Sequence, residues 1–166
     1  MKGTAAGKKT NFYDLAIEII SLLCLAWCFY PLLFYGELEA VRIPVHFNMA
    51  GEADGWGGRS RLWDLPVVAL VIYAGLSILQ RFPRIYNYPV KVTERNAGSL
   101  YRLGSHLVLY IKAVAIAIFA YINNSAVSMA LGTGNGLNAV VMGALIAGLF
   151  LILAVFCIKM LMLKDR

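Results

Sequence analysis

The sequence of 166 residues is poor in charge, histidine and cysteine, and each shortage argues against a class of protein. Charged side chains make up 14% of the residues and hydrophobic ones 60%. The long apolar runs lack a polar stripe wide enough for an amphipathic helix of a soluble bundle. The three cysteines, with Cys24 and Cys28 one helical turn apart in an apolar run, predict buried apolar fillers and no disulfide framework.

Four apolar runs are present instead, and they predict an all-α integral membrane four-helix bundle that forms a single domain over 1–166. The fourth run is about 33 Å long as a helix, enough to cross a hydrocarbon core of about 30 Å. The second and third runs are about 22 to 24 Å, so we expect them to recruit flanking residues such as Trp63 and Arg81. The predicted spans are 15–35, 63–81, 103–122 and 137–158.

Lysine and arginine gather at alternate gaps between these runs, which predicts the orientation. They occupy the N-terminal tail (Lys2, Lys8, Lys9), the segment 81–102 and the C-terminal end (Lys159, Lys164, Arg166), whereas 123–136 has none. We therefore expect both termini and the basic loop 82–102 in the cytoplasm, with 36–64 outside, in a bacterial cytoplasmic membrane. The net charge of +6 is then a topology signal, and we expect no nucleic-acid partner.

The outer loop 36–64 is predicted to be a structured cap. Residues 42–47 should be extended because Pro44 opposes a helix, and a glycine-rich turn follows. Trp56 and Trp63 are expected to seat this cap at the membrane interface. Its candidate residues, for binding or for structure, are Pro44, His46, Phe47, Asn48, Gly51, Glu52, Asp54 and Gly55.

Two chemistries remain open for this cap besides recognition of a partner. His46, Glu52 and Asp54 supply nitrogen and oxygen donors for a divalent cation, with Asn48 nearby. The spacing does not match a calcium loop and only one histidine is present, so a structural turn with a satisfied histidine is the favoured interpretation. No cofactor is predicted, and the divalent cation stays as the alternative.

The second outer segment, 123–136, contains Gly-Thr-Gly-Asn-Gly but no lysine and no preceding strand. A phosphate-binding loop needs both, so we predict a flexible linker here.

In the inner segment, Thr93 is a plausible N-cap of the third helix. Arg95, Ser99, Arg102 and His106 follow helical spacing and are predicted to share one face. This basic stripe would bind anionic lipid head groups or a cytoplasmic regulator, and the simpler alternative is a solvated face.

Two charges fall inside predicted spans. Glu18 lies about 4.5 Å into the first run and Lys112 about 7.5 Å into the third, both from the same side. We expect them to pair across neighbouring helices, with snorkelling of Lys112 as the alternative.

Small residues recur every four positions at Ala139, Gly143 and Ala147, and at Ala113 and Ala117. Such spacing lets helices approach closely. We expect packing within one bundle, with a homodimer as the alternative.

The segment Ile43-Pro-Val-His-Phe-Asn-Met-Ala-Gly-Glu-Ala-Asp-Gly-Trp-Gly resembles the signature of a bacterial membrane domain family of unknown function. Tyr88-Pro-Val-Lys-Val-Thr-Glu-Arg-Asn-Ala is also similar to this family. A relative of the family is the immunity protein against a sporulation-delaying peptide toxin. The resemblance implies a membrane location, and through that relative it implies toxin resistance and membrane capture of a repressor.

The sequence thus predicts a non-enzymatic envelope protein whose cap recognises or resists a membrane-active peptide, such as a peptide toxin. A small transporter or channel subunit is the second candidate, although polar residues within the spans are few: Ser21, Tyr73 and Ser77. A metal-dependent membrane enzyme centred on His46 and Asp54 is the third, and it lacks a second histidine and an evident nucleophile.

Overall fold

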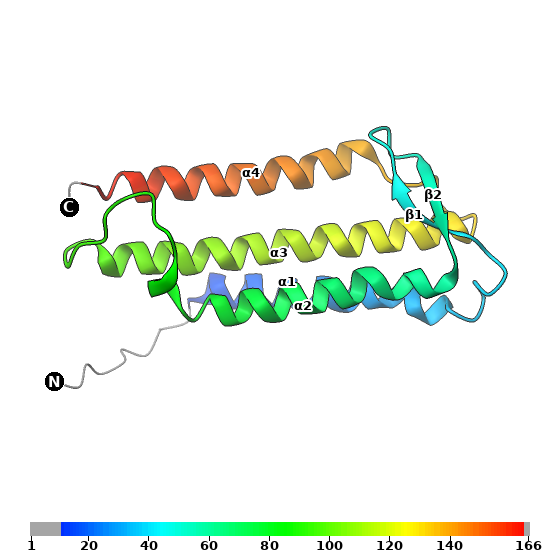
Figure 1. Ribbon diagram of the computed structural model, residues 1–166, viewed down its shortest axis with the longest axis horizontal. Coiled ribbons are helices and arrows are strands. Elements are labelled where there is room, and N and C mark those ends of the chain that lie inside the picture. The colour runs from blue at the N-terminus through cyan, green and yellow to red at the C-terminus, as the bar shows by residue number, and fades with distance from the viewer. Residues whose placement is uncertain (1–10, 165–166) are drawn as a thin grey trace.

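The computed structural model describes residues 11–164, so Lys2, Lys8, Lys9 and Arg166 of the orientation argument lie outside the described residues. The chain is mostly helical, and its four long helices run side by side as a bundle (Figure 1). They are α1 (Phe12–Phe29), α2 (Asp64–Leu79), α3 (Ala97–Ala130) and α4 (Ala139–Leu161).

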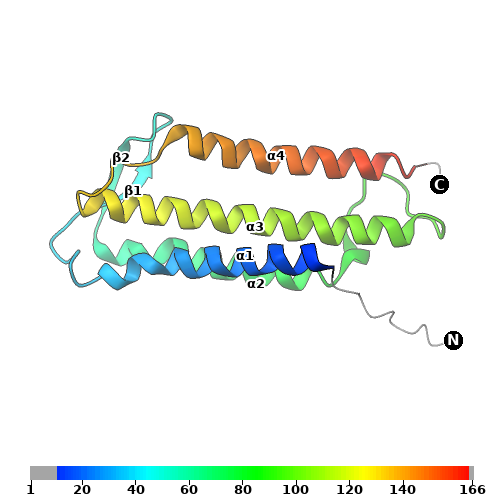
Figure 2. The same cartoon turned by 180° about the vertical axis from the view of Figure 1, so that it is seen from behind.

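A small antiparallel hairpin of β1 (Ile43–Phe47) and β2 (Ala53–Gly57) lies at one end of this bundle, which we name the cap end (Figure 1). The beginning of α1 and the end of α4 both lie at the opposite end, named here the terminal end (Figure 2). Three short 3₁₀ helices complete the elements: η1 (Tyr30–Phe34), η2 (Arg59–Trp63) and η3 (Pro83–Ile85).

All four helices are long and apolar enough to cross a membrane, as the sequence predicts. The candidate spans are Phe12–Phe34, Arg59–Leu79, Ala97–Ala130 and Ala139–Leu161. The second therefore gains its length from η2, which precedes α2. The protein is a multi-pass membrane protein with a four-helix bundle fold.

The third helix is longer than expected at its cap end. It continues to Ala130, so the prediction of a linker is wrong for 123–130, and the connection to α4 is only 131–138. In this continued part of α3, the side-chain amides of Asn123 and Asn124 donate to the backbone oxygens of Cys28 and Trp27 on α1, each at 2.9 Å. These asparagines therefore link α3 to α1 at positions where the sequence predicted a linker.

At the terminal end, α3 begins at Ala97 with Asn96 as the N-cap, and the predicted cap Thr93 forms a capping-box pair with Asn96 one turn earlier. The Asn96 side chain accepts a hydrogen bond from the Thr93 amide at 2.8 Å, and the Asn96 amide donates to the Thr93 hydroxyl at 3.3 Å. This reciprocal pair closes a turn that precedes the helix. Arg95 lies in that turn and not on α3.

The core at mid-bundle is formed where α1, α2 and α3 meet. It consists of Leu25, Cys28, Ala69, Ile116 and Ala120. Cys24, Cys28 and Cys157 are all free thiols, and of the three only Cys28 is fully buried, as predicted for an apolar filler, whereas Cys24 and Cys157 are half-buried.

The fourth helix packs along α3 and stands apart from α1 and α2 (Figures 1 and 2). Its contacts with α3 and the terminal loop include Tyr110 against Phe156, with ring centroids 5.7 Å apart, and Met160 in a cluster with Leu100 and Val90. The small residues of α4 lie on other faces: Ala139, Gly143 and Ala147 are exposed.

A Cβ placed on Gly143 would meet nothing within 4 Å. The prediction that this small-residue repeat packs within the bundle is therefore wrong, because larger side chains of α4 make the contact with α3.

Candidate functional site

The cap hairpin holds most of the motif residues and is irregular in register. Ile43 pairs with Gly57 and Pro44 with Trp56, and shifts follow on either side of the pair His46–Gly55. A Cβ on Gly55 would stand 2.9 Å from the Cβ of His46, so only glycine fits opposite that histidine. Irregular pairing of this kind re-aims side chains and is frequent near functional sites.

Asn48 organises the turn between the strands. Its side-chain oxygen accepts from the amides of Ala50 at 2.9 Å and Glu52 at 3.0 Å, and its side-chain nitrogen donates to the Glu52 carboxylate at 3.0 Å. Asparagine is favoured in turns for this bonding of its own backbone. Asn48 and Glu52 therefore serve the turn structure.

Gly51 seats this turn on the connection between α3 and α4. Its φ of 84° is in the left-handed region, and its carbonyl accepts from the Leu137 amide at 3.0 Å. A Cβ at this position would stand 1.9 Å from the Leu137 carbonyl oxygen. The motif glycine thus fixes the cap to the helical bundle.

His46 and Asp54 face one another across the hairpin, with the His46 Nδ1 atom bonded to the Asp54 carboxylate. Both side chains are exposed, at 71% and 45%. Glu52 is turned to Asn48 instead, and within residues 11–164 no group of three His, Cys, Asp or Glu side chains is placed to hold a metal ion. The structure brings two of the three candidate ligands together and leaves out the third.

Beneath β1 lies a cavity of about 360 Å³, a size typical of ligand sites. Its walls come from β1, from the beginning of α2 and from the cap-end part of α3. Apolar side chains dominate them: Ile43, Pro44, Val45, Phe47, Leu62, Leu65, Ile122, Ala126 and Leu137. His46, Asn123 and the salt-bridged pair Arg61–Asp64, 3.2 Å apart, supply the polar groups.

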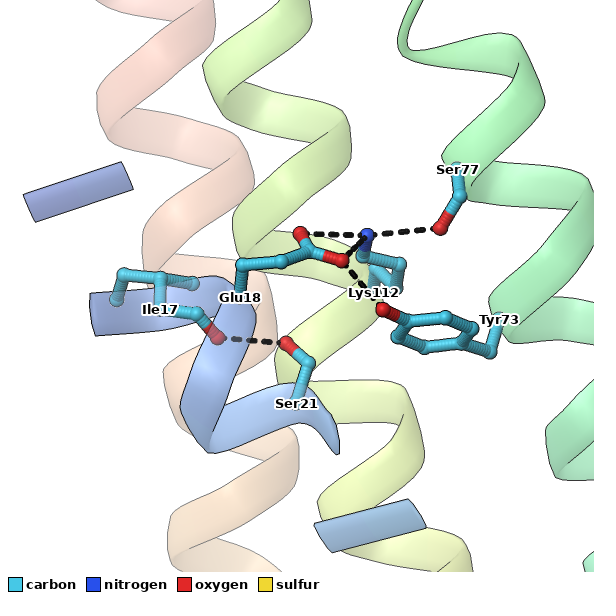
Figure 3. Close-up of polar contacts among 6 residues, drawn as sticks. All are labelled: Ile17, Glu18, Ser21, Tyr73, Ser77 and Lys112. Atoms are coloured by element: carbon cyan, nitrogen blue, oxygen red, sulfur yellow. Dashed lines mark hydrogen bonds and ion pairs between the residues drawn. The ribbon is translucent and has the colours of Figure 1, made fainter. Parts of the chain in front are cut away.

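A second site lies inside the membrane-spanning part, where Lys112 of α3 meets Glu18 of α1 (Figure 3). The Lys112 ammonium donates to both carboxylate oxygens, at 2.9 and 2.8 Å, and to the Ser77 hydroxyl at 2.9 Å. The Tyr73 hydroxyl donates to the same carboxylate, and the Lys112 nitrogen lies 4.6 Å from the centre of the Tyr73 ring. An ammonium has three N–H donors, so Lys112 is fully satisfied although it is fully buried.

Tyr73 and Ser77 are hydrogen-bond partners of Glu18 and Lys112. From the sequence they could be recognised as polar residues within a span, but not as partners of these two charges. They lie four residues apart on α2 and so share one helix face. That spacing was a usable signal, but nothing in the sequence indicated which helix α2 would face.

The basic stripe is not continuous in the structure. Arg95 lies before α3, and Arg102 is exposed. His106 faces α1, where its Nε2 atom lies 3.2 Å from the Asp14 carboxylate and its side chain is 22% exposed. The prediction that these residues share one helix face is therefore wrong for Arg95, because α3 begins two residues after it.

Tyr86 and Tyr88 hold the loop between α2 and α3 against α3. Their hydroxyls donate to the carbonyls of Leu79 and Pro83, both at 2.8 Å, and they pack over Gly104. Burial raises the pKa of Tyr88 to about 12, and the neighbouring Tyr86 and Tyr101 add to the rise.

This architecture defines the class, a multi-pass membrane protein with a hairpin cap. Residues 22–70 match a family described as "Domain of unknown function (DUF1648)", and they run from α1 through the hairpin into α2. An uncharacterized protein of Archaeoglobus fulgidus is 30% identical over 83 residues, which cover 45% of this chain and 44% of that protein. No solved structure matches.

These matches support a membrane domain family of unknown function. The match to the family spans the hairpin motif and includes Gly51 and Asp54. Neither match names an immunity protein, so that relationship stays an expectation of the resemblance.

Proposed function

We propose that this protein is a non-enzymatic recognition protein whose cap binds an apolar segment of a cationic, membrane-active peptide at the membrane surface. The observation that carries the proposal is the largely apolar cavity beneath β1. It lies at the end of the spanning helices, where an amphipathic peptide lies in the interface with its apolar face toward the membrane.

The charge of the cap supports a cationic occupant. Segment 36–64 has five acidic residues and three arginines, a net charge of −2, in a chain whose net charge is +6. Val45 lines the cavity and is partly exposed, and the exposed Met49, Trp56 and Trp63 of the same segment would widen the contact. Tryptophans at an interface anchor both a cap and a bound amphipathic segment. Capture at this surface would give resistance, the role that the resemblance implies.

A small transporter or channel is the second candidate, favoured by the polar cluster around Lys112. The apolar cluster of Leu25, Cys28, Ala69, Ile116 and Ala120 lies between that polar cluster and the cap cavity. A conducting path along the bundle would have to cross this apolar layer, so recognition is the better-supported function.

Peptide binding tests the proposal directly. The probe is a synthetic amphipathic helix of leucine and lysine, and the protein is held in phosphatidylcholine nanodiscs with tryptophan fluorescence as readout. Leu65→Trp fills the cavity and should weaken binding about tenfold, the loss expected when an apolar anchor is excluded from its pocket.

Leu70→Trp, on the exposed face of the same helix, is the matched control and should bind as the unmodified protein does. Cells that carry Leu65→Trp should lose any resistance conferred by the unmodified protein, while Leu70→Trp retains it. Equal binding by both variants would overturn the assignment of the cavity.

A further inference from the structure

A polar cavity of about 470 Å³ lies beside the Glu18–Lys112 pair, at the terminal end of the bundle. It is separate from the cap cavity and independent of the proposed function. Its walls are formed by Glu18, Ser77, Gln80, Arg81, Pro83, Ser105 and Lys112.

The charges that line this cavity do not balance. Glu18 neutralises Lys112 through two hydrogen bonds, so the pair contributes no net charge. Arg81 then remains, and within residues 11–164 its guanidinium has no acidic partner. The cavity therefore has a net charge of about +1, which suits a ligand that carries one negative charge.

The position of Arg81 favours a membrane lipid as the source of that anion. Arg81 follows the last residue of α2 by two positions, at the boundary where the spanning segment ends and lipid head groups begin. Ile78 and Phe82 flank it and are 60% and 55% exposed. A lipid could place its phosphate in the cavity and its acyl chains along these two side chains, whereas a free anion would use the cavity alone.

We infer that this cavity binds the phosphodiester of an anionic membrane lipid, with Arg81 as the charged contact. The planar guanidinium matches two phosphate oxygens at once. The Ser105 hydroxyl donates to the Gln80 backbone carbonyl at 3.2 Å, so its oxygen is left to accept from the glycerol part of a head group, and the Gln80 side-chain amide is a second neutral group there. The buried ion pair keeps the far wall polar without adding charge.

Lipid titration tests the inference on the full chain in phosphatidylcholine nanodiscs. Phosphatidylglycerol is the probe, and bound lipid is counted by native mass spectrometry. Arg81→Gln should weaken retention of phosphatidylglycerol about tenfold, which corresponds to about 1.4 kcal/mol.

Arg84→Gln is the matched control, since Arg84 is exposed on the same loop but does not line the cavity. It should change retention less than twofold. Similar losses in both variants would assign binding to the general basic surface and overturn the inference. The melting temperature in lipid without phosphatidylglycerol should be the same for both variants, which excludes misfolding as the cause.

Inorganic phosphate and glycerol phosphate form the second arm. If either binds the protein as strongly as phosphatidylglycerol does, the lipid source is wrong and the cavity is a site for a free anion. If neither does so, and Arg81→Gln alone weakens lipid retention, the inference stands.

Discussion

The Lys112 ammonium and the Glu18 carboxylate form a two-fold hydrogen-bonded ion pair between α3 and α1, and the Lys112 side chain has no solvent exposure. The buried ammonium would be costly alone in this environment, because neither bulk water nor another carboxylate of residues 11–164 compensates it. Pairing, with Ser77 and Tyr73 as further partners, makes the buried position tolerable.

Removing one partner of this pair should therefore cost more than removing both. We expect Lys112→Met to lower the free energy of unfolding by about 3 kcal/mol, because it leaves Glu18 uncompensated. Glu18→Gln combined with Lys112→Met should recover part of that loss. Thermal unfolding in detergent across the double-mutant cycle measures the coupling, and purely additive effects would show that the pair contributes nothing.

Gly104 should not tolerate a side chain. A Cβ there would stand 2.6 Å from the Tyr88 hydroxyl and 2.8 Å from the Tyr86 ring. We expect Gly104→Ala to destabilise the protein by about 1 to 3 kcal/mol, the usual cost of overpacking. Gly98→Ala on the same helix meets nothing within 4 Å and should be neutral or stabilising by up to about 1 kcal/mol. Melting temperatures of the two variants make the comparison, and a stable Gly104→Ala would contradict the packing described.

Gly51 should be needed for the attachment of the cap. We expect Gly51→Ala to detach the turn from Leu137. The new Cβ would clash with the Leu137 carbonyl oxygen, and alanine would be strained at the positive φ of this residue. Hydrogen exchange at 43–57 should rise while exchange within the helices stays unchanged. Gly58→Ala, where a Cβ meets nothing, is the control. Unchanged exchange in Gly51→Ala would mean that the cap is held elsewhere.

The predicted orientation can be tested with single introduced cysteines. Glu52 and Arg95 are both exposed; Glu52 belongs to the hairpin turn and Arg95 directly precedes α3. The hairpin and the beginning of α3 lie at opposite ends of the bundle (Figure 1). In a variant with the native cysteines replaced, Glu52→Cys should react with an impermeant thiol reagent in intact cells, and Arg95→Cys only after permeabilisation. The reverse pattern would invert the protein in its membrane and assign the basic loop to the outside.

Much of the cap hairpin could be predicted from local chemistry. Pro44, the alternation around His46 and the glycines after Asn48 indicated an extended segment and a turn, and the structure has both. The pairing of His46 with Asp54 could not be predicted, because it depends on an irregular strand register. The need for glycine at position 51 could not be predicted either, since Leu137, which it contacts, is far away in the sequence.

Two of the errors concern residues whose role depends on a neighbouring helix. Asn123 and Asn124 were predicted to lie in a linker, but their side-chain amides donate to backbone carbonyls of α1. Ala139, Gly143 and Ala147 looked like a packing seam, but α4 turns this repeat away from α3. Local patterns of polarity and size do not state which surface a helix will meet.

The sequence by itself determined that the chain has four segments able to cross a lipid bilayer. The free energy of transferring an apolar run into lipid is the sum of contributions from the residues of that run alone. Only the tertiary structure decided which faces of α1, α2 and α4 pack on α3, and hence that Glu18, Tyr73, Ser77 and Lys112 converge while His106 meets Asp14. Those choices rest on complementary packing and hydrogen bonding between helices, which depend on pairs of surfaces rather than on any one segment.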